Sequence, residues 1–264
     1  MTLRVAIEGV SFWASRLPGW ETARAVMTGE QPPPEAASTR PSPTLLAPTE
    51  RRRAPDTVAV ALEVAARACE AAGRKPSDLP SVFASTHGDL AISDYMCSTL
   101  ATTPALISPI KFHNSVHNAA AGYWSIGTGS LAPYTAISSY LYTFAEGLVE
   151  AATQVVCEQR PVLYVAFDIE AKGALATMAS SRGLLGAALV LAPVSQAQQH
   201  RSLMLTTESV GECHPTPARS AAAPLVADNA LAPCLPFFEA LASSQPRTLS
   251  LALGRQMALN VQVN

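Results

Sequence analysis

The stretch that decides the fold is Pro133-Tyr-Thr-Ala-Ile-Ser-Ser-Tyr-Leu-Tyr-Thr143, in the middle of the chain. Residues 133–138 predict a β-strand, because β-branched, aromatic and small apolar side chains dominate them. Residues 141–158 predict a helix, because their apolar side chains recur at helical spacing on one face. The residues of that face are Leu141, Phe144, Leu148, Ala151 and Val155. A strand that runs directly into a long helix is a building unit of α/β proteins.

The turn between this strand and this helix is where α/β enzymes place a nucleophile. Free N–H groups and the helix dipole lower the pKa of a thiol there. The turn here offers Ser138, Ser139, Tyr140 and Tyr142, but no cysteine and no Gly-x-Ser-x-Gly elbow. It therefore has the architecture of a nucleophilic turn without the usual nucleophile. The two serines are more simply explained as helix caps.

Further segments with strand and helix patterns lie on both sides of this stretch. The other predicted strands are residues 3–10, 81–85, 161–167, 186–191, 203–209 and 259–263. The other predicted helices are residues 57–72, capped by Asp56, and shorter ones within 19–29, 91–102, 118–126 and 236–243. Residues 31–55 contain seven prolines and predict an extended surface loop. The alternation of strands and helices predicts an α/β fold with a mainly parallel sheet.

Composition limits the class of protein. The chain has 264 residues, of which 48% are apolar and 14% charged, and its net charge is −2. This balance excludes intrinsic disorder and argues against a nucleic-acid partner. No apolar run reaches the length of a membrane span, and the N-terminus lacks the pattern of a signal peptide. The five cysteines are scattered and form no CxxC pair, so a reduced, cytoplasmic protein is expected.

Three short motifs match known chemistry only in part. His113 and His117 have the spacing of a zinc-binding helix, but no glutamate lies between them, so no metal site is predicted. Gly127-Thr-Gly129 lacks the third glycine of a dinucleotide loop and follows a predicted helix, so no cofactor is expected. Cys213 and His214 are neighbours in sequence, whereas a catalytic dyad needs apposition in space.

Three consecutive arginines, Arg51, Arg52 and Arg53, stand at the end of the proline-rich segment. Their positive charge can dock an acidic partner. Equally, they can form a solvated loop end, or one of them can pair with an acidic residue of the helix that follows. The sequence leaves both alternatives open.

Four segments in this order resemble the N-terminal half of β-ketoacyl synthases, which have the thiolase fold. They are Glu50-Arg-Arg-Arg53 with its alanine-rich helix, Asn118-Ala-Ala-Ala-Gly-Tyr-Trp-Ser-Ile126, the stretch 133–143, and Gly186-Ala-Ala-Leu-Val-Leu191. The resemblance spans residues 3–210. It implies a truncated thiolase-like fold, mainly the N-terminal half, with a central mixed or parallel sheet flanked by helices. Residues 1–210 would form the ketosynthase-like domain, and residues 211–264 a shortened closing segment of the same domain.

The catalytic residues of that family are not retained. By the same resemblance, its nucleophilic cysteine falls on Leu141. Its two catalytic histidines belong to a C-terminal half that this chain does not complete. Cys213-His-Pro-Thr216 is only weakly similar to the family's His-Gly-Thr motif, and no Gly-Phe-Gly-Gly segment occurs. The resemblance therefore implies a catalytically inactive ketosynthase homologue.

Within this superfamily, three segments are similar to the short ketosynthase-like chain-length factors of aryl-polyene and xanthomonadin-type pigment clusters. They are Phe112-His-Asn-Ser-Val-His-Asn-Ala-Ala-Ala-Gly-Tyr-Trp-Ser-Ile126, Val82-Phe-Ala-Ser85 and Glu158-Gln-Arg-Pro-Val162. The similarity implies a subunit that pairs with a catalytic ketosynthase, as a heterodimer or heterotetramer, and does not condense acyl units. Such a subunit shapes the acyl tunnel during polyene chain elongation, and it meets an acyl carrier protein through the complex.

The resemblance also implies particular site residues. The pseudo-active site and acyl tunnel would involve Tyr140, Leu141, Tyr142 and Phe144. The dimer interface would contain Tyr134, Thr135, Ala136, Ile137, Ser138, Asn118 and Trp124. Arg51, Arg52 and Arg53 would be candidates for carrier-protein docking. A chain with about half of the fold leaves apolar surface that a partner subunit would cover.

Two other functions remain open. The first is a stand-alone acyl hydrolase or acyltransferase that uses Ser138 or Ser139 with His87, His113 or His117. Such an enzyme would turn over an activated acyl ester without a partner, and a serine-to-alanine change would abolish turnover. The second is a homodimeric acyl-binding or scaffold protein, which would form a stable dimer in solution without a ketosynthase.

Overall fold

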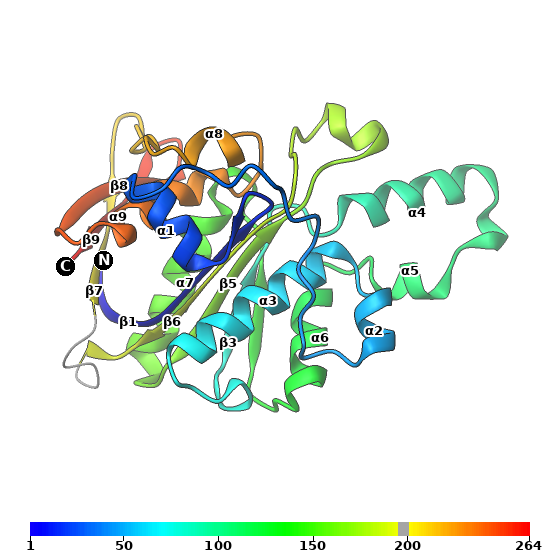
Figure 1. The fold of residues 1–264 in the computed structure, drawn as a ribbon, viewed down its shortest axis with the longest axis horizontal. Helices are drawn as coiled ribbons and strands as arrows, with labels where there is room; N and C mark the ends of the chain where they lie inside the picture. Colours follow the sequence, from blue (N-terminus) through cyan, green and yellow to red (C-terminus); the bar gives the residue numbers. More distant parts are fainter. Residues whose placement is uncertain (195–200) are drawn as a thin grey trace.

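Nine strands form one sheet in the computed structural model, which describes residues 1–194 and 201–264 (Figure 1). Their spatial order is β4 (Tyr134–Ile137), β3 (Ser81–Ala84), β5 (Val162–Asp168), β6 (Leu185–Ala192), β1 (Thr2–Ala14), β7 (Arg201–Ser209), β9 (Met257–Val263) and β8 (Arg247–Gly254), with β2 (Leu17–Pro18) paired to β1. The helices of the described residues are α1 (Trp20–Thr28), α2 (Pro48–Arg53), α3 (Asp56–Ala71), α4 (Leu90–Thr102), α5 (Pro109–His113), α6 (Ala119–Thr128), α7 (Thr143–Glu158), α8 (Ala223–Val226) and α9 (Leu235–Ala242). Each strand and helix that the sequence predicts has a counterpart here, which confirms the α/β class.

The direction of the strands differs from the prediction of a mainly parallel sheet. Among the strands of the described residues, only β4, β3 and β5 run parallel to one another, and the other neighbours pair antiparallel. Parallel pairing needs a long crossover, which α6 and α7 supply before β4 and β5. Between β5 and β6 the chain forms only the five-residue 3₁₀ helix η4 (Gly173–Thr177). The sheet is therefore mixed, with its parallel part at one edge.

Three local differences from the sequence prediction have simple causes. Within the proline-rich segment, α2 begins at Pro48, because proline is favourable in the first turn of a helix. The long helix α7 begins at Thr143, after the 3₁₀ turn η3 (Tyr140–Tyr142), rather than at residue 141. Pro55, not Asp56, is the N-cap of α3, so the predicted side-chain cap is wrong.

The C-terminal segment after residue 210 adds to the same sheet. Its β9 pairs with β7, and β8, for which the sequence analysis predicts no strand, pairs with β9 at the far edge. Helix α9 packs against β8 and against α1. The buried side chains of α9, β8 and β9 belong to the same hydrophobic cluster as those of β1, β5 and α7.

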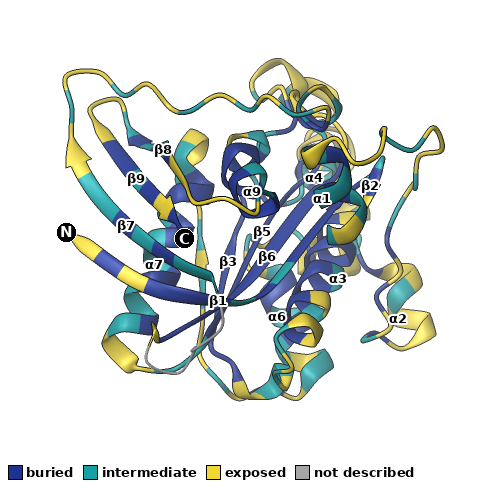
Figure 2. Ribbon diagram, turned by 60° about the vertical axis from the view of Figure 1, so that its left-hand side comes forward, coloured by how far each residue is buried: buried dark blue, intermediate teal, exposed yellow. Residues whose placement is uncertain are grey.

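The central strands β3, β5 and β6 are buried on both faces, whereas β4, β7 and β8 are partly exposed (Figure 2). Along β5, Tyr164 faces the cluster beneath α7 and α9, whereas the next residue, Val165, faces the cluster beneath α3 and α6. Because both faces of β5 are buried, successive positions all favour apolar side chains, and residues 162–167 form an uninterrupted apolar run. On the α3 side, Gly9 of β1 allows close approach, because a Cβ there would collide with the carbonyl oxygen of Ala68.

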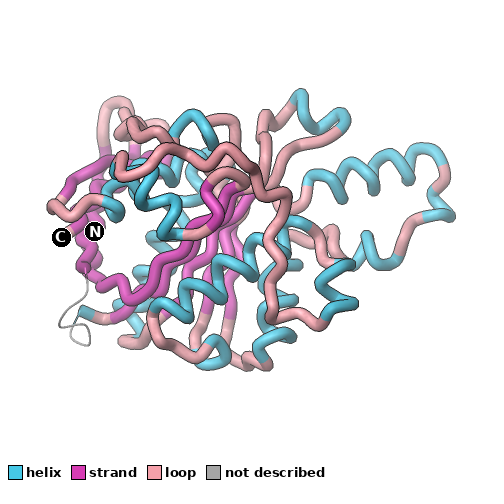
Figure 3. The backbone as a smooth tube through the Cα atoms, viewed as in Figure 1, coloured by secondary structure: helices cyan, strands magenta, loops and turns pink. Residues whose placement is uncertain are grey.

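Two excursions leave the sheet at the carboxyl ends of parallel strands. After β3, the helices α4 and α5 form an arm that extends away from the sheet (Figures 1 and 3). After β5, the segment with η4 packs against α4. Among the described residues, no helix combines the length and apolar character needed to cross a bilayer.

Candidate functional site

The turn after β4 is built by a small hydrogen-bond network. Thr143 Oγ1 accepts a hydrogen bond from the Ser139 N–H (2.9 Å) and donates one to the Tyr140 carbonyl oxygen (2.7 Å). The Tyr142 N–H donates to the carbonyl oxygen of Ser139. Tyr140 has φ 49°, in the left-handed region that residues other than glycine rarely adopt. The turn leaves Tyr140 and Leu141 each 57% exposed at the start of α7.

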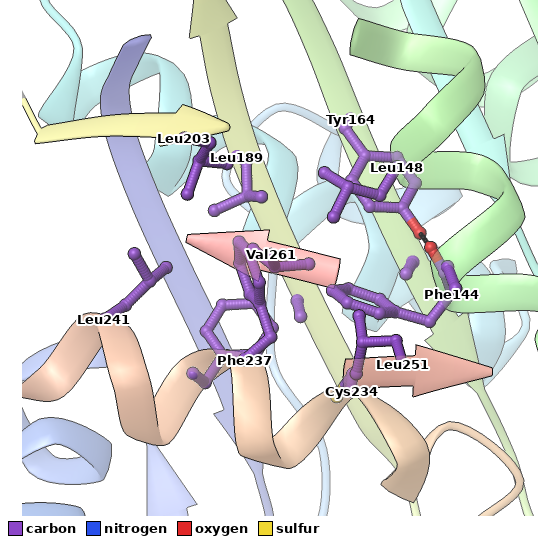
Figure 4. Close-up of a cluster of buried hydrophobic side chains, with 14 of the residues drawn as sticks. Phe144, Leu148, Tyr164, Leu189, Leu203, Cys234, Phe237, Leu241, Leu251 and Val261 are labelled. Carbon is purple, nitrogen blue, oxygen red and sulfur yellow. Dashed lines mark hydrogen bonds between the residues drawn. The ribbon is translucent and has the colours of Figure 1, made fainter. Parts of the chain in front are cut away.

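The residues predicted for the pseudo-active site differ sharply in burial. Leu141 is exposed, whereas Phe144 retains only 4% of its accessible surface. The Phe144 ring packs against Phe237 and Tyr164 at centroid distances of 5.5 and 5.6 Å (Figure 4). The Tyr164 hydroxyl also donates to the Phe144 carbonyl oxygen (2.7 Å). Phe144 is therefore a core residue that fixes the start of α7.

A cavity of about 420 Å³ lies beside this turn. Leu141, Tyr142 and Phe144 contribute to its wall. The rest of the wall comes from residues 215–218, from the segment that begins α9, and from β8. The structure thus brings three of the four predicted residues together with the C-terminal segment, for which the sequence analysis predicts no functional residue.

The serines of the turn are not hydrogen-bonded to a histidine within residues 1–194 and 201–264. Ser138 Oγ donates to the Thr86 carbonyl oxygen (2.9 Å), which cannot act as a base toward the hydroxyl. His117 Nε2 lies 2.8 Å from the Ser85 carbonyl oxygen, and His87 packs edge-on against a tyrosine of the turn. The prediction that these serines cap the helix is wrong, since neither η3 nor α7 has a side-chain cap.

The histidines and cysteines that were candidates for metal binding or catalysis lie in other surroundings. His113 ends α5 and packs against Tyr123, while His117 lies beyond that helix, so the two do not share a helical face. In the part of the chain that the structure describes, no three His, Cys, Asp or Glu side chains group closely enough for a metal. Burial raises the pKa of the Cys69 thiol to about 12 and that of Cys234 still further, so both thiols stay protonated.

A buried carboxyl group that the sequence analysis did not single out organises the neighbouring loop. Asp168, at the end of β5, accepts hydrogen bonds at Oδ1 from Ser85 Oγ (2.9 Å) and from the N–H groups of Thr86 (3.0 Å) and His87 (3.3 Å). Burial raises the pKa of Asp168, and these hydrogen bonds oppose the shift. Ser85 Oγ also accepts from the Gly88 N–H (2.9 Å). The sequence signal was an acidic residue closing an otherwise apolar strand.

Strand β4 is an edge strand, and within the described residues it pairs only with β3. The Ser85 N–H donates to the Ile137 carbonyl oxygen, so Ile137 faces β3. Because alternate residues of a strand direct their N–H and C=O groups to opposite sides, Tyr134 and Ala136 direct theirs outward. An open edge of this kind is a template for pairing with another chain.

Two other residues predicted for the dimer interface lie in different surroundings. Asn118 is near the surface, where its Nδ2 donates to the hydroxyl of Tyr134 (3.1 Å). Trp124 is buried, and its ring packs against Phe83 at a centroid distance of 6.5 Å. The Trp124 side chain therefore belongs to the core beneath α6 and not to accessible surface.

Exposed apolar side chains concentrate in residues 100–141, the stretch of the chain that contains β4. Of the fourteen large hydrophobic residues that are exposed in the described chain, ten lie between residues 100 and 141. These ten, here called the apolar surface, are Leu100, Leu106, Ile110, Phe112, Val116, Ile126, Leu131, Tyr134, Tyr140 and Leu141. They belong to the α4–α5 arm, the end of α6, β4 and η3. Contiguous apolar patches mark interaction surfaces, whereas single exposed hydrophobic residues are ordinary.

The three arginines lie in α2. Arg51 is partly buried and donates to the Leu46 carbonyl oxygen (2.9 Å), while Arg52 and Arg53 are exposed. An ion pair with the following helix was one of the alternatives for these arginines. Arg40 makes such a pair instead, with its Nε 3.2 Å from the carboxylate of the first residue of α3. Arg52 and Arg53 are thus the accessible part of this cluster.

Comparison with protein families matches residues 20–248 to the family described as "Beta-ketoacyl synthase, N-terminal domain". No curated protein matches the chain. Solved structures of low sequence identity share its fold. In the complex of the ketosynthase ApeO with its chain length factor ApeC from Xenorhabdus doucetiae, one chain superposes with a TM-score of 0.74 at 22% identity. That superposition covers 98% of this chain and 99% of the other.

Two further structures show the same architecture. The ishigamide ketosynthase/chain length factor has a TM-score of 0.69 at 13% identity, over 99% of both chains. A β-ketoacyl synthase from Burkholderia phymatum STM815 has a TM-score of 0.60 at 16% identity, over 87% of this chain and 70% of the other. At these identities the similarity establishes the fold.

Proposed function

This chain belongs to the family of the β-ketoacyl synthase N-terminal domain and has its thiolase-like fold, and on that premise we propose that it is a non-catalytic chain-length factor. The observation that carries the proposal is the turn after β4. There the motif similarity assigns the family's nucleophile position to Leu141, an alkyl side chain that cannot be acylated. The strand, turn and helix around Leu141 are nevertheless intact.

Chain length supports this proposal. Nearly all of this chain and nearly all of the matched chain align in the two ketosynthase/chain length factor complexes, so the matched chains are of similar length. The Burkholderia β-ketoacyl synthase is only 70% covered and is therefore longer. This chain therefore aligns over nearly its whole length with chains of ketosynthase/chain length factor structures. The product class we assign, from the sequence resemblance, is a polyene chain of aryl-polyene or xanthomonadin type.

The proposed partner is a catalytic ketosynthase that pairs with the open edge of β4. Tyr134 of this strand and the flanking Leu131 and Leu141 belong to the apolar surface, so the partner would cover them and remove them from water. Tyr140 and Leu141 would then reach the partner's acyl tunnel, where their bulk ends the cavity and limits the chain by overlap. The acyl carrier protein would act through the complex, with Arg52 and Arg53 facing an acidic surface.

Co-expression with a ketosynthase encoded beside this protein tests the proposal. This chain alone carries the affinity tag, and the solution mass of the purified species is measured. A one-to-one or two-to-two complex is expected. A stable species that contains only this chain contradicts the proposed heterodimer. It favours the alternative of a homodimeric acyl-binding protein.

The absence of catalysis has its own test. Leu141→Cys restores a thiol at the helix N-terminus, but no described histidine lies hydrogen-bonded in this turn to activate it. We expect no malonyl-dependent elongation by the purified Leu141→Cys chain, with Leu141→Ser as the matched control. Measurable elongation by the cysteine variant alone contradicts the proposal.

A further inference from the structure

A polar groove, which the proposed function does not use, lies where α3 meets the β1–β2 hairpin and the start of α1. Its volume, about 850 Å³, is within the range of about 300–1,000 Å³ typical of small-molecule sites. Residues 38–44 of the proline-rich segment form a further wall. Two of the three tryptophans of the chain, Trp13 and Trp20, line this groove. It shares no residue with the cavity beside Leu141.

Hydrogen bonds and an ion pair hold the proline-rich wall in place. The Ser38 N–H donates to the carbonyl oxygen of Ser15 (2.7 Å). Arg40 Nη2 donates to the carbonyl oxygen of Ala54 (2.7 Å), and Arg40 Nε lies 3.2 Å from the carboxylate of Asp56. The groove is therefore formed by the folded chain itself and needs no partner subunit.

Two buried polar side chains of the groove lack a protein partner. Ser11 is 3% exposed and Trp13 is 6% exposed, and both line the groove. Within residues 1–194 and 201–264, neither the Ser11 hydroxyl nor the Trp13 indole N–H is hydrogen-bonded. They are two residues apart on β1, so they lie on the same face of the strand. Buried polar groups normally have a partner, so this pair of donors fits a ligand that carries acceptor oxygens.

The charged side chains of the groove already have partners. Arg67 pairs with Glu63 and Glu70, each at an N–O distance of 3.0 Å. Arg40 pairs with Asp56, so neither arginine of the groove is left to neutralise an anionic ligand. The carboxylate oxygens of Glu63 and Glu70 have further lone pairs, which can accept hydrogen bonds from the hydroxyl groups of a ligand.

We propose that this groove binds an uncharged ring compound that carries several hydroxyl groups, of the class of neutral sugars. Its oxygens accept hydrogen bonds from Ser11 and Trp13, and its hydroxyl groups donate to Glu63. The Trp20 ring packs edge-on against Phe238 at a centroid distance of 6.0 Å and offers the sugar ring a fixed apolar wall. A simple organic cation cannot accept the two hydrogen bonds, and an anion would be repelled by the carboxylates.

Calorimetric titration of the full chain with the methyl glycosides of glucose, galactose and mannose tests the proposal. At least one should bind one-to-one with a dissociation constant of about 1 mM or below, as a few hydrogen bonds and contact with an aromatic ring provide. The uronate of the same sugar, which carries a carboxylate, should bind at least about tenfold more weakly. Tetramethylammonium should not displace the glycoside. Absent saturable binding of all three glycosides, or tighter binding of the uronate or of tetramethylammonium, overturns the proposal.

Two variants and a matched control locate the site. Ser11→Ala and Trp13→Phe each remove one donor with little change in packing, so each should weaken glycoside binding about fivefold. Trp124→Phe also removes an indole N–H, but from the core beneath α6 and outside the groove, so it should bind like the wild type. If Trp13→Phe fails to fold, Ser11→Ala still decides. Wild-type affinity in the folded groove variants overturns the proposal.

The groove and the heterodimer can fail separately. Loss of co-purification with a ketosynthase, while a glycoside still binds, contradicts the proposed function and leaves the groove site standing. Intact co-purification without glycoside binding contradicts the groove site and leaves the heterodimer standing.

Discussion

Leu141 and Phe144 are three residues apart and share a helical face in the sequence pattern, yet they have opposite surroundings. Leu141 lies in η3 and is exposed, whereas Phe144 lies in the first turn of α7 and is buried. The left-handed conformation of Tyr140 causes this difference, because it turns the chain before the regular helix begins. Side chains at 140 and 141 are therefore free to act on a partner, while residue 144 stabilises the fold.

Substitutions at Tyr140 and Leu141 should shift product length in the ketosynthase complex. Leu141→Ala should lengthen the products and Leu141→Trp should shorten them, because side-chain bulk ends the tunnel by overlap. At position 140, Tyr140→Asn is preferred to a β-branched residue, since asparagine tolerates positive φ. Mass spectrometry of the products provides the measurement. An unchanged product distribution across this series removes both residues from the tunnel.

Phe144→Ala should act on stability. Removal of a buried aromatic ring costs about 3–5 kcal/mol in free energy of unfolding, because it leaves a cavity among the aromatic rings. Leu141→Ala, at an exposed site, should change that free energy by less than about 0.5 kcal/mol. Denaturant unfolding of both variants checks the contrast. Equal effects at the two positions would show that Phe144 does not anchor the helix.

Asp168 should make stability depend on pH. Burial places the folded pKa of Asp168 above its ordinary value, so unfolding releases a proton when the pH lies between the two values. The contribution of this bound proton to the free energy of unfolding is fully present below the ordinary pKa of an aspartate. It is lost as the pH rises through the pKa of Asp168 in the folded state. The stability difference between wild type and Asp168→Asn should therefore decline with rising pH. Urea unfolding across this pH range measures it, and a rising difference would show that the hydrogen bonds dominate.

At the scale of elements, β4 is an edge strand that leads into a helix fixed to the core. Its inner side pairs with β3, and in the described residues its outer side meets no strand. The helix that follows it is fixed to the core through Phe144. A partner that pairs with this edge would therefore dock on a rigid element and lie beside Tyr140 and Leu141.

Ala136→Pro should block that pairing selectively. The Ala136 N–H is directed to the open edge, so proline removes an outward donor and no hydrogen bond to β3. We expect an isolated chain that folds normally, as judged by circular dichroism, and that no longer co-purifies with the ketosynthase. Ala136→Val, which keeps the N–H, is the matched control. Co-purification of the proline variant at wild-type yield places the interface elsewhere.

At the scale of the whole molecule, the two edges of the sheet have different surroundings. Beyond β8, hydrogen bonds between Thr216 and Ser250 bring the C-terminal segment alongside the edge. The β4 edge carries no such cover in the described chain, and Tyr134 of β4 and the flanking Leu131 and Leu141 are exposed. The asymmetry matches a subunit that is closed on one side and completed by a partner on the other.

The double variant Leu106→Ser/Phe112→Ser tests the apolar surface. Both side chains are on the α4–α5 arm, 71% and 63% exposed, so the free energy of unfolding should change by less than about 0.5 kcal/mol. Affinity for the ketosynthase should fall at least about tenfold, because less apolar area is buried. Met257→Ser, an exposed apolar residue outside the apolar surface, is the control. Surface plasmon resonance compares them, and equal affinity for the double variant and the control excludes the arm from the interface.

Much of this molecule was predictable from local patterns. The apolar run of β5, the amphipathic helix α3 and the strand–turn–helix around residue 140 each carry their own periodicity, which depends on neighbours a few residues away. The lack of a nucleophile in that turn is likewise a property of residue identity. For these features the sequence alone was sufficient.

Only the tertiary structure decided what depends on distant partners. The mixed direction of the sheet follows from which strands meet, and the apolar pattern of β6 is the same in either direction. Phe144 and Phe237, far apart in the chain, meet because the C-terminal segment folds back over α7, and the cavity beside Leu141 exists for the same reason. Asp168 organises the loop after β3 because Ser85 and Thr86 of that loop donate hydrogen bonds to its carboxylate. Local periodicity specifies which face of an element is apolar, but not which distant residues will cover it.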